Sequence, residues 1–168
     1  MVERVLRGFL LMLVAALVGC DHATKIVAKI TLEGSAPKAV IPGVLDLVYT
    51  ENRDTAFSLL HGVTSPAKGP LILLMSCLAI AAIAVAWWKR RRVAGLVERA
   101  AFVLVVGGAI GNVIDRIEQG YVVDFIHLRR WPVFNVADMA ICVGGALVGI
   151  VMMRSRKSGD SPPVRPSA

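Results

Sequence analysis

The sequence predicts an all-α membrane bundle of four transmembrane helices with a small extracytoplasmic β-rich loop region. One observation is composition: 56% of the 168 residues are hydrophobic, a larger share than soluble domains of this length carry. The other is spacing, because four apolar stretches approach the about 20 residues that a helix needs to cross a bilayer. These stretches run over residues 5–28, 70–88, 97–114 and 136–153.

Basic residues flank these stretches and predict their direction. The run Lys89-Arg90-Arg91-Arg92 separates the second stretch from the third, which marks this short loop as cytoplasmic. With four spans, both termini then lie in the cytoplasm, and each terminus is basic. The formal charge of +7 is therefore explained by topology, and nucleic-acid binding is not expected.

The segments between and after the spans have different expected structures. Residues 30–69 form a long outer loop, in which strand-forming residues around the turn signal Pro42-Gly43 predict short strands on the membrane surface. Residues 117–135 form a second outer loop, whose mixed apolar and charged composition suits the bilayer interface. Residues 1–157 are expected to be a single domain, followed by a disordered cytoplasmic tail, residues 158–168.

The N-terminus has a competing interpretation. Leu17-Val18-Gly19-Cys20 follows basic and apolar residues in the way that a lipobox ends the signal peptide of a lipoprotein. Cleavage there would leave a lipid-tethered protein with three further spans, whereas lipoproteins are typically soluble domains, so a transmembrane helix is favoured. Cys77 and Cys142 also lie in apolar stretches, and three cysteines without regular spacing argue against a disulfide framework or a zinc site.

Ionisable residues inside a membrane segment are costly and therefore mark candidate sites. Asp21 and Lys25 lie one turn apart near the outer end of the first span, where an ion pair that fixes packing and a substrate contact are both open. The third span ends in Gly107-Gly108-Ala109-Ile110-Gly111-Asn112-Val113-Ile114-Asp115-Arg116. Its glycines permit either close helix approach or access for a substrate backbone. Asn112 and Arg116 share one face of this helix.

Two further carboxylates stand in apolar surroundings at the same side of the membrane. Asp124 lies within Val122-Val123-Asp124-Phe125-Ile126, and Asp138 lies at the start of the fourth span, three residues after Asn135. Taken singly, an aspartate near a helix start is commonly a cap. Two carboxylates brought together there would share a proton near neutral pH and could activate water for attack on an amide. A rival, Asp115, is interpreted as a supporting charge because it adjoins Arg116.

Together these runs resemble the lipoprotein signal peptidase family, the type II signal peptidases of bacteria. The resemblance covers Asp21-x-x-x-Lys25, the segment from Asn52 to Phe57-Ser58, the 107–116 run, Val122-Val123-Asp124-Phe125, and Phe134-Asn135-x-Ala137-Asp138. It implies an aspartyl endopeptidase of the bacterial inner membrane, with its active site at the outer face. Such an enzyme removes signal peptides from diacylglyceryl-modified prolipoproteins by cutting before the lipidated cysteine.

The resemblance also implies residue roles, with Asp124 and Asp138 as the catalytic pair. The residues expected to bind substrate or support the pair are Asp21, Lys25, Asn52, Gly108, Asn112, Arg116 and Asn135. No metal or organic cofactor is implied. The expected partners are lipid-modified prolipoproteins and membrane lipid, and the expected state is a monomer. In one departure, Asp54 stands where the family often has glycine.

A non-enzymatic alternative is a small multi-pass transporter or a bundle subunit without peptidase activity. In that case Asp21, Lys25, Asp115 and Arg116 would line an ion path. Depth separates the two hypotheses, because transport sites lie near the midplane of the membrane. Here the charges gather at one end of the spans, and the second span carries none.

Overall fold

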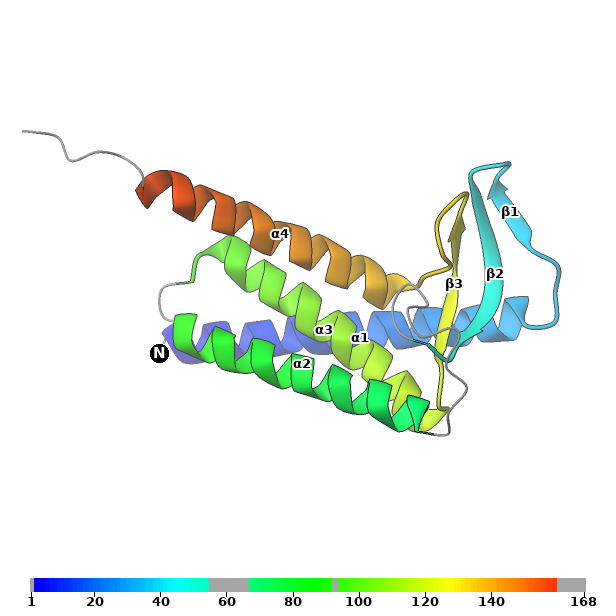
Figure 1. The fold of residues 1–168 in the computed structure, drawn as a ribbon, viewed down its shortest axis with the longest axis horizontal. Coiled ribbons are helices and arrows are strands. Elements are labelled where there is room, and N and C mark those ends of the chain that lie inside the picture. Colours follow the sequence, from blue (N-terminus) through cyan, green and yellow to red (C-terminus); the bar gives the residue numbers. More distant parts are fainter. Residues whose placement is uncertain (1, 55–66, 92–93, 160–168) are drawn as a thin grey trace, which may run out of the picture.

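In the part of the chain that the structure describes, the fold consists of four long helices and one small sheet (Figure 1). The computed structural model describes residues 2–54, 67–91 and 94–159. In chain order the elements are α1 (Val2–Leu32), β1 (Lys38–Ile41), β2 (Leu45–Asn52), α2 (Lys68–Arg90), α3 (Leu96–Glu118), β3 (Val122–Leu128) and α4 (Val136–Gly159).

All four helices are long and apolar enough to cross a membrane, which confirms the expected number of spans. Each helix is longer than its apolar stretch, because the helical backbone continues past the residues that match the hydrocarbon core. The helix α4 extends to Gly159, past residue 158, where the tail was expected to begin. The rest of that tail, residues 160–168, lies outside the described residues, and the single-domain assignment stays a prediction.

The helix α3 lies at the centre of the bundle and packs against the other three helices. Half of the residues in the most apolar segment of α3 are buried, whereas the buried share of the corresponding segment is 6% in α1, 6% in α2 and 17% in α4. Two glycines allow this central position. A Cβ atom at Gly111 would lie 2.6 Å from Asp21 Oδ2 of α1, and one at Gly108 would overlap the backbone carbonyl of Ala137 in α4.

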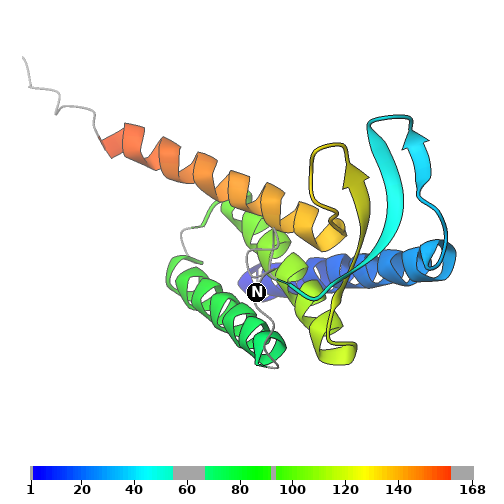
Figure 2. The same cartoon turned by 45° about the vertical axis from the view of Figure 1, so that its right-hand side comes forward.

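The three strands form an antiparallel sheet in the order β1-β2-β3. The sheet lies at one end of the bundle, and its strands run across the direction of the helices (Figure 2). This confirms a small β-rich region, although its position outside the cytoplasm stays a prediction. The sequence did not indicate β3, which lies in the second outer loop. Pairing of Thr50 with Asp124 and of Asn52 with Val122 brings β2 beside the strand that connects α3 to α4.

Candidate active site

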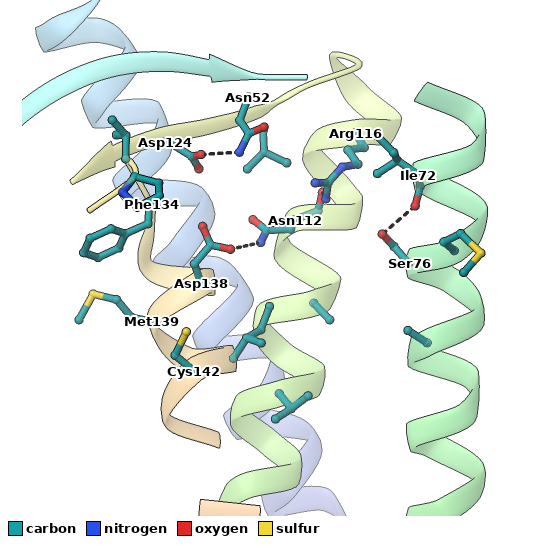
Figure 3. A pocket seen from close by; sticks show the side chains of 18 of the residues that line it. Asn52, Ile72, Ser76, Asn112, Arg116, Asp124, Phe134, Asp138, Met139 and Cys142 are labelled. Atoms are coloured by element: carbon teal, nitrogen blue, oxygen red, sulfur yellow. Dashed lines mark hydrogen bonds between the residues drawn. The ribbon is translucent and has the colours of Figure 1, made fainter. Parts of the chain in front are cut away.

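A cavity of about 570 Å³ opens between α2, α3, α4 and the end of the sheet. The polar side chains that line it include Asn52, Asn112, Arg116, Asp124 and Asp138 (Figure 3). Apolar side chains of α2, α3 and α4, together with those of residues 131–134 between β3 and α4, line most of the remainder. The structure therefore brings five of the sequence-predicted residues, from four different elements, to one cavity.

Asp124 is held in the middle of β3 and is only 1% exposed. Its Oδ2 accepts a hydrogen bond of 2.8 Å from Asn52 Nδ2, and its Oδ1 accepts one of 2.6 Å from Asn135 Nδ2. Burial raises the pKa of Asp124 to about 7, because removal from water disfavours the charged form. The nearby Asp138 raises this pKa further, whereas the hydrogen bond from Asn52 opposes the rise.

Asp138 lies in the first turn of α4 and is more exposed than Asp124. Its Oδ1 accepts a hydrogen bond of 2.8 Å from Asn112 Nδ2, and its Oδ2 accepts one of 3.3 Å from the backbone N–H of Asn135. In return, the backbone N–H of Asp138 donates to Asn135 Oδ1 over 2.9 Å. This reciprocal pair is a capping arrangement that begins the helix and fixes the carboxylate.

Two asparagines join the carboxylates to each other. Asn135 Nδ2 donates both to Asp124 Oδ1 and, over 3.2 Å, to Asn112 Oδ1. Asn112 in turn donates to Asp138. Each of the four carboxylate oxygens thus accepts one hydrogen bond from a buried or half-buried donor, so the positions of both side chains are set by the surrounding protein.

Behind the asparagines lies a buried charge cluster made of Asp21, Lys25 and Asp115. Lys25 Nζ lies 2.7 Å from Asp21 Oδ2 and 2.9 Å from Asp115 Oδ2, and it donates to Asn112 Oδ1 over 2.9 Å. All three charged side chains are at most 3% exposed. Asp21 and Lys25 therefore form the ion pair that their spacing allowed, and neither lines the cavity.

Arg116 lies at the edge of the cavity near the end of β2. Its Nη1 donates to the backbone carbonyl of Asn112, and its Nη2 donates to that of Asp54, each over 3.2 Å. The backbone N–H of Asp54 donates to Asn52 Oδ1 over 2.9 Å, which forms a local turn without glycine. The Asp54 carboxylate also lies 3.1 Å from Lys68 Nζ at the start of α2. Residues 55–58 of this motif lie outside the described residues.

The sequence did not indicate every residue at the site. The α2 residues Ile72, Met75 and Ser76 line the cavity, but a continuous apolar stretch carries no signal that distinguishes them from lipid-facing neighbours. The sequence also carried no signal for the ion pair between Asp54 and Lys68, because it forms only where the segment after β2 meets the start of α2 in the folded protein. Of the sequence-predicted residues, Gly108 packs against α4, so its close contact is with a helix.

Among the residues that the structure describes, no group of three or more histidine, cysteine, aspartate or glutamate side chains is arranged to hold a metal ion. The donors around Asp124 and Asp138 are side-chain amide and backbone N–H groups.

Comparison with known proteins identifies the family. The family model described as Signal peptidase (SPase) II matches residues 13–154. The lipoprotein signal peptidase of Geobacter metallireducens is 39% identical over 150 residues, which cover 84% of this chain and 89% of that protein. The lipoprotein signal peptidase of Syntrophotalea carbinolica is 38% identical, with 89% and 92% covered.

Solved structures agree with this result. A bacterial membrane enzyme solved by the in meso method at 2.3 Å resolution superposes with a TM-score of 0.78 at 25% identity, covering 94% of this chain and 95% of that one. A second, solved by the same method at 1.9 Å, gives a TM-score of 0.75 at 28% identity, with 86% and 92% covered. The chain therefore belongs to the signal peptidase II family.

Proposed function

We propose that this protein is an aspartic endopeptidase that removes signal peptides from diacylglyceryl-modified prolipoproteins, cutting before the lipidated cysteine. We assign Asp124 and Asp138 as the catalytic pair. The observation that carries this assignment is the hydrogen bonding of the two carboxylates, which come from different elements yet are joined through Asn112 and Asn135 at one cavity.

The two carboxylates have surroundings suited to different roles. Asp124 is the more buried, and its pKa of about 7 keeps a substantial fraction of its side chain protonated at neutral pH. We assign Asp138, which is the more exposed of the two at the cavity, the role of the base. The ionised carboxylate takes a proton from water as the water attacks, while protonated Asp124 donates a hydrogen bond to the scissile carbonyl. Such proton sharing is the chemistry that hydrolyses amides in aspartic proteases.

The apolar part of the cavity suits the hydrophobic segment of a signal peptide. A second cavity of about 640 Å³ lies farther along the same helices, and Ile83 and Val105 line both cavities. Together they follow α2, α3 and α4 away from the carboxylates. We assign these two cavities to the apolar segment of the substrate, with Asn52 and Arg116 facing the polar segment around the scissile bond.

We infer that the sheet and the catalytic pair lie at the outer face of the bacterial inner membrane. The helix α2 ends in the basic residues Lys89 and Arg90 at the opposite end of the bundle from the sheet, which supports a cytoplasmic position for that end. Both termini then lie in the cytoplasm, and we propose that the protein acts as a monomer. The transporter alternative is not favoured, because the relatives are named as peptidases.

A cleavage assay tests the proposal. Purified protein is mixed with a diacylglyceryl-modified prolipoprotein, and the product is detected by its mass. We expect Asp124→Asn and Asp138→Asn each to abolish cleavage, because an asparagine at either position can neither carry the shared proton nor act as the base. Both variants should still insert and fold, since asparagine has nearly the same shape as aspartate.

Asp115→Asn is the control that separates the pair from its rival. The substitution removes a buried charge partner of Lys25 and is expected to lower stability while residual cleavage remains measurable. Near-normal turnover by either Asp124→Asn or Asp138→Asn would overturn the assignment.

A further inference from the structure

Two tight turns lie side by side at one end of the sheet. In the turn between β1 and β2, the Val44 N–H donates to the Ile41 carbonyl over 3.0 Å. In the turn after β3, the Trp131 N–H donates to the Leu128 carbonyl over 2.9 Å. The Arg129 N–H donates to the Val44 carbonyl over 3.0 Å and joins the turns. We call residues 41–44 and 128–131 the sheet tip.

The sheet tip exposes large apolar side chains that lie outside the four membrane helices. Ile41 is 50% exposed, Val44 52%, Leu128 37% and Trp131 52%. Apolar side chains exposed on the helices face lipid, which accounts for them. A cluster of four on a part of the chain beyond the spans indicates a surface that binds an apolar or amphipathic partner.

The sheet tip is also basic and contains no acidic residue. Arg129 and Arg130 are both exposed, and neither guanidinium forms a hydrogen bond or ion pair with any residue in the described part of the chain. Arg130 has a φ of 69°, a left-handed conformation that glycine or asparagine would adopt with less strain. An arginine at this position therefore keeps its positive charge on the turn at a cost in backbone energy.

The position of the tip indicates the partner. The strands run across the helices, and the tip projects sideways past the first turn of α4 (Figures 1 and 2). When the helices cross a bilayer, the tip therefore lies over lipid beside the bundle, continuous with its lipid-facing surface. Tryptophan and aliphatic side chains favour the interfacial layer, and arginines there attract negatively charged headgroups.

We propose that the sheet tip binds anionic phospholipids of the adjacent leaflet. The apolar side chains lie among the glycerol groups and upper acyl chains, and the guanidinium groups of Arg129 and Arg130 bind headgroup phosphates. Trp131 also lines the candidate active-site cavity. The anchor therefore holds the rim of the cavity at the level of the lipid surface. Only this last consequence rests on the proposed peptidase function.

Fluorescence quenching by brominated lipids tests the binding without any cleavage. The reporter protein carries Trp87→Phe and Trp88→Phe, so Trp131 is its only tryptophan, and it is placed in phosphatidylcholine nanodiscs. Either brominated phosphatidylglycerol or brominated phosphatidylcholine is then added at the same low fraction. We expect brominated phosphatidylglycerol to quench Trp131 as strongly as a local concentration about fivefold or more above its added fraction would. The reason is that one arginine near an anionic surface favours binding by about that factor.

Variants at Arg130 separate the effect of its positive charge from the effect of its left-handed backbone conformation. Arg130→Gly suits the left-handed conformation and removes the charge, so the protein should stay folded while the enrichment of phosphatidylglycerol falls about fivefold. Arg130→Lys should retain most of the enrichment. Lys38→Gln, an exposed charge of the same sheet away from the tip, should leave it unchanged.

Several results would overturn the proposal. In the reporter protein, these results are equal quenching of Trp131 by the two lipids or no quenching by either lipid. In the variants, they are an undiminished enrichment of phosphatidylglycerol in Arg130→Gly, or a loss of enrichment in Lys38→Gln as large as that in Arg130→Gly. Because quenching is read without substrate, these results are independent of whether the protein cleaves prolipoproteins.

Discussion

Asp21 Oδ1 accepts a hydrogen bond of 2.8 Å from the backbone N–H of Ala137, the residue immediately before Asp138. A parallel contact exists on the other side, where Asp115 Oδ2 accepts a hydrogen bond of 3.3 Å from the N–H of Val123, the residue before Asp124. Lys25 bridges the two accepting carboxylates. One buried cation therefore lies behind both chain segments that carry the proposed catalytic pair.

This arrangement predicts that Lys25→Met strongly destabilises the protein. The substitution leaves Asp21 and Asp115 buried without their cation, and loss of one partner from a buried ion pair typically costs about 3–5 kcal/mol. Thermal unfolding of the purified protein in detergent measures the effect. Lys29→Met is the matched control one turn later, where the lysine donates to the hydroxyl of Tyr121 and lies over its ring, so a much smaller loss is expected. Similar losses in the two variants would contradict the role of Lys25.

Asn112→Ala is predicted to lower kcat by about 100-fold with little change in KM, because it removes the side-chain donor that positions Asp138. Initial rates over a range of lipidated prolipoprotein concentrations separate kcat from KM. Ser76→Ala is the control within the same cavity, since its hydroxyl donates to the Ile72 carbonyl in its own helix, and its kcat should stay within about twofold. A rise in KM alone for Asn112→Ala would show that Asn112 binds substrate and does not position the carboxylate.

The raised pKa of Asp124 predicts that kcat/KM falls as the pH rises above about 7, because the proton needed to polarise the scissile carbonyl is lost. A pH–rate profile with a soluble lipopeptide substrate checks this. The assignment fails if activity stays constant from pH 6 to about pH 9, roughly two units beyond that pKa.

The same pKa predicts a pH dependence of stability. Between the ordinary value of 3.8 and about 7, the folded protein holds a proton on Asp124 that the unfolded chain releases. The contribution of Asp124 to the free energy of unfolding therefore decreases as pH rises through this window. Asp124→Asn, which cannot ionise, should gain stability relative to the parent as the pH rises, and melting curves at several pH values measure the difference. A constant difference would contradict the prediction.

Gly108→Ala is predicted to destabilise the protein by about 1–3 kcal/mol, because its Cβ would overlap the carbonyl of Ala137 and push α4 away from α3. Gly145→Ala is the matched control, since a Cβ at this α4 position meets no atom within 4 Å, and its stability should be unchanged or slightly higher. Thermal unfolding compares the variants. Displacement of α4 also moves Asp138, so cleavage by Gly108→Ala should fall with its stability. Equal stability of the two variants would refute the packing role of Gly108.

Much of the fold could be predicted because the relevant signals are local. Hydrophobic length determines that a segment crosses the membrane, and the run from Lys89 to Arg92 indicates the direction of the spans. The resemblance to a family placed Asp124 and Asp138 in one site, and the structure brings both to one cavity. The strand β3 was not indicated, because it forms only through pairing with β2, whose paired residues lie 70 or more positions earlier in the chain.

The sequence by itself determined the four spans, the family and the residues expected to react. Only the tertiary structure decided which of those residues contact one another and how deeply each is buried, since hydrogen bonds and burial depend on distances between segments remote in the chain. The spacing of Asp21 and Lys25 allowed either a structural ion pair or a substrate contact. Their burial, and the arrival of Asp115 from α3 as a second partner of Lys25, show that they form a structural ion pair behind the proposed catalytic pair. The difference between Asp124 and Asp138 likewise arises from burial in the folded protein, which removes water from one carboxylate more than from the other.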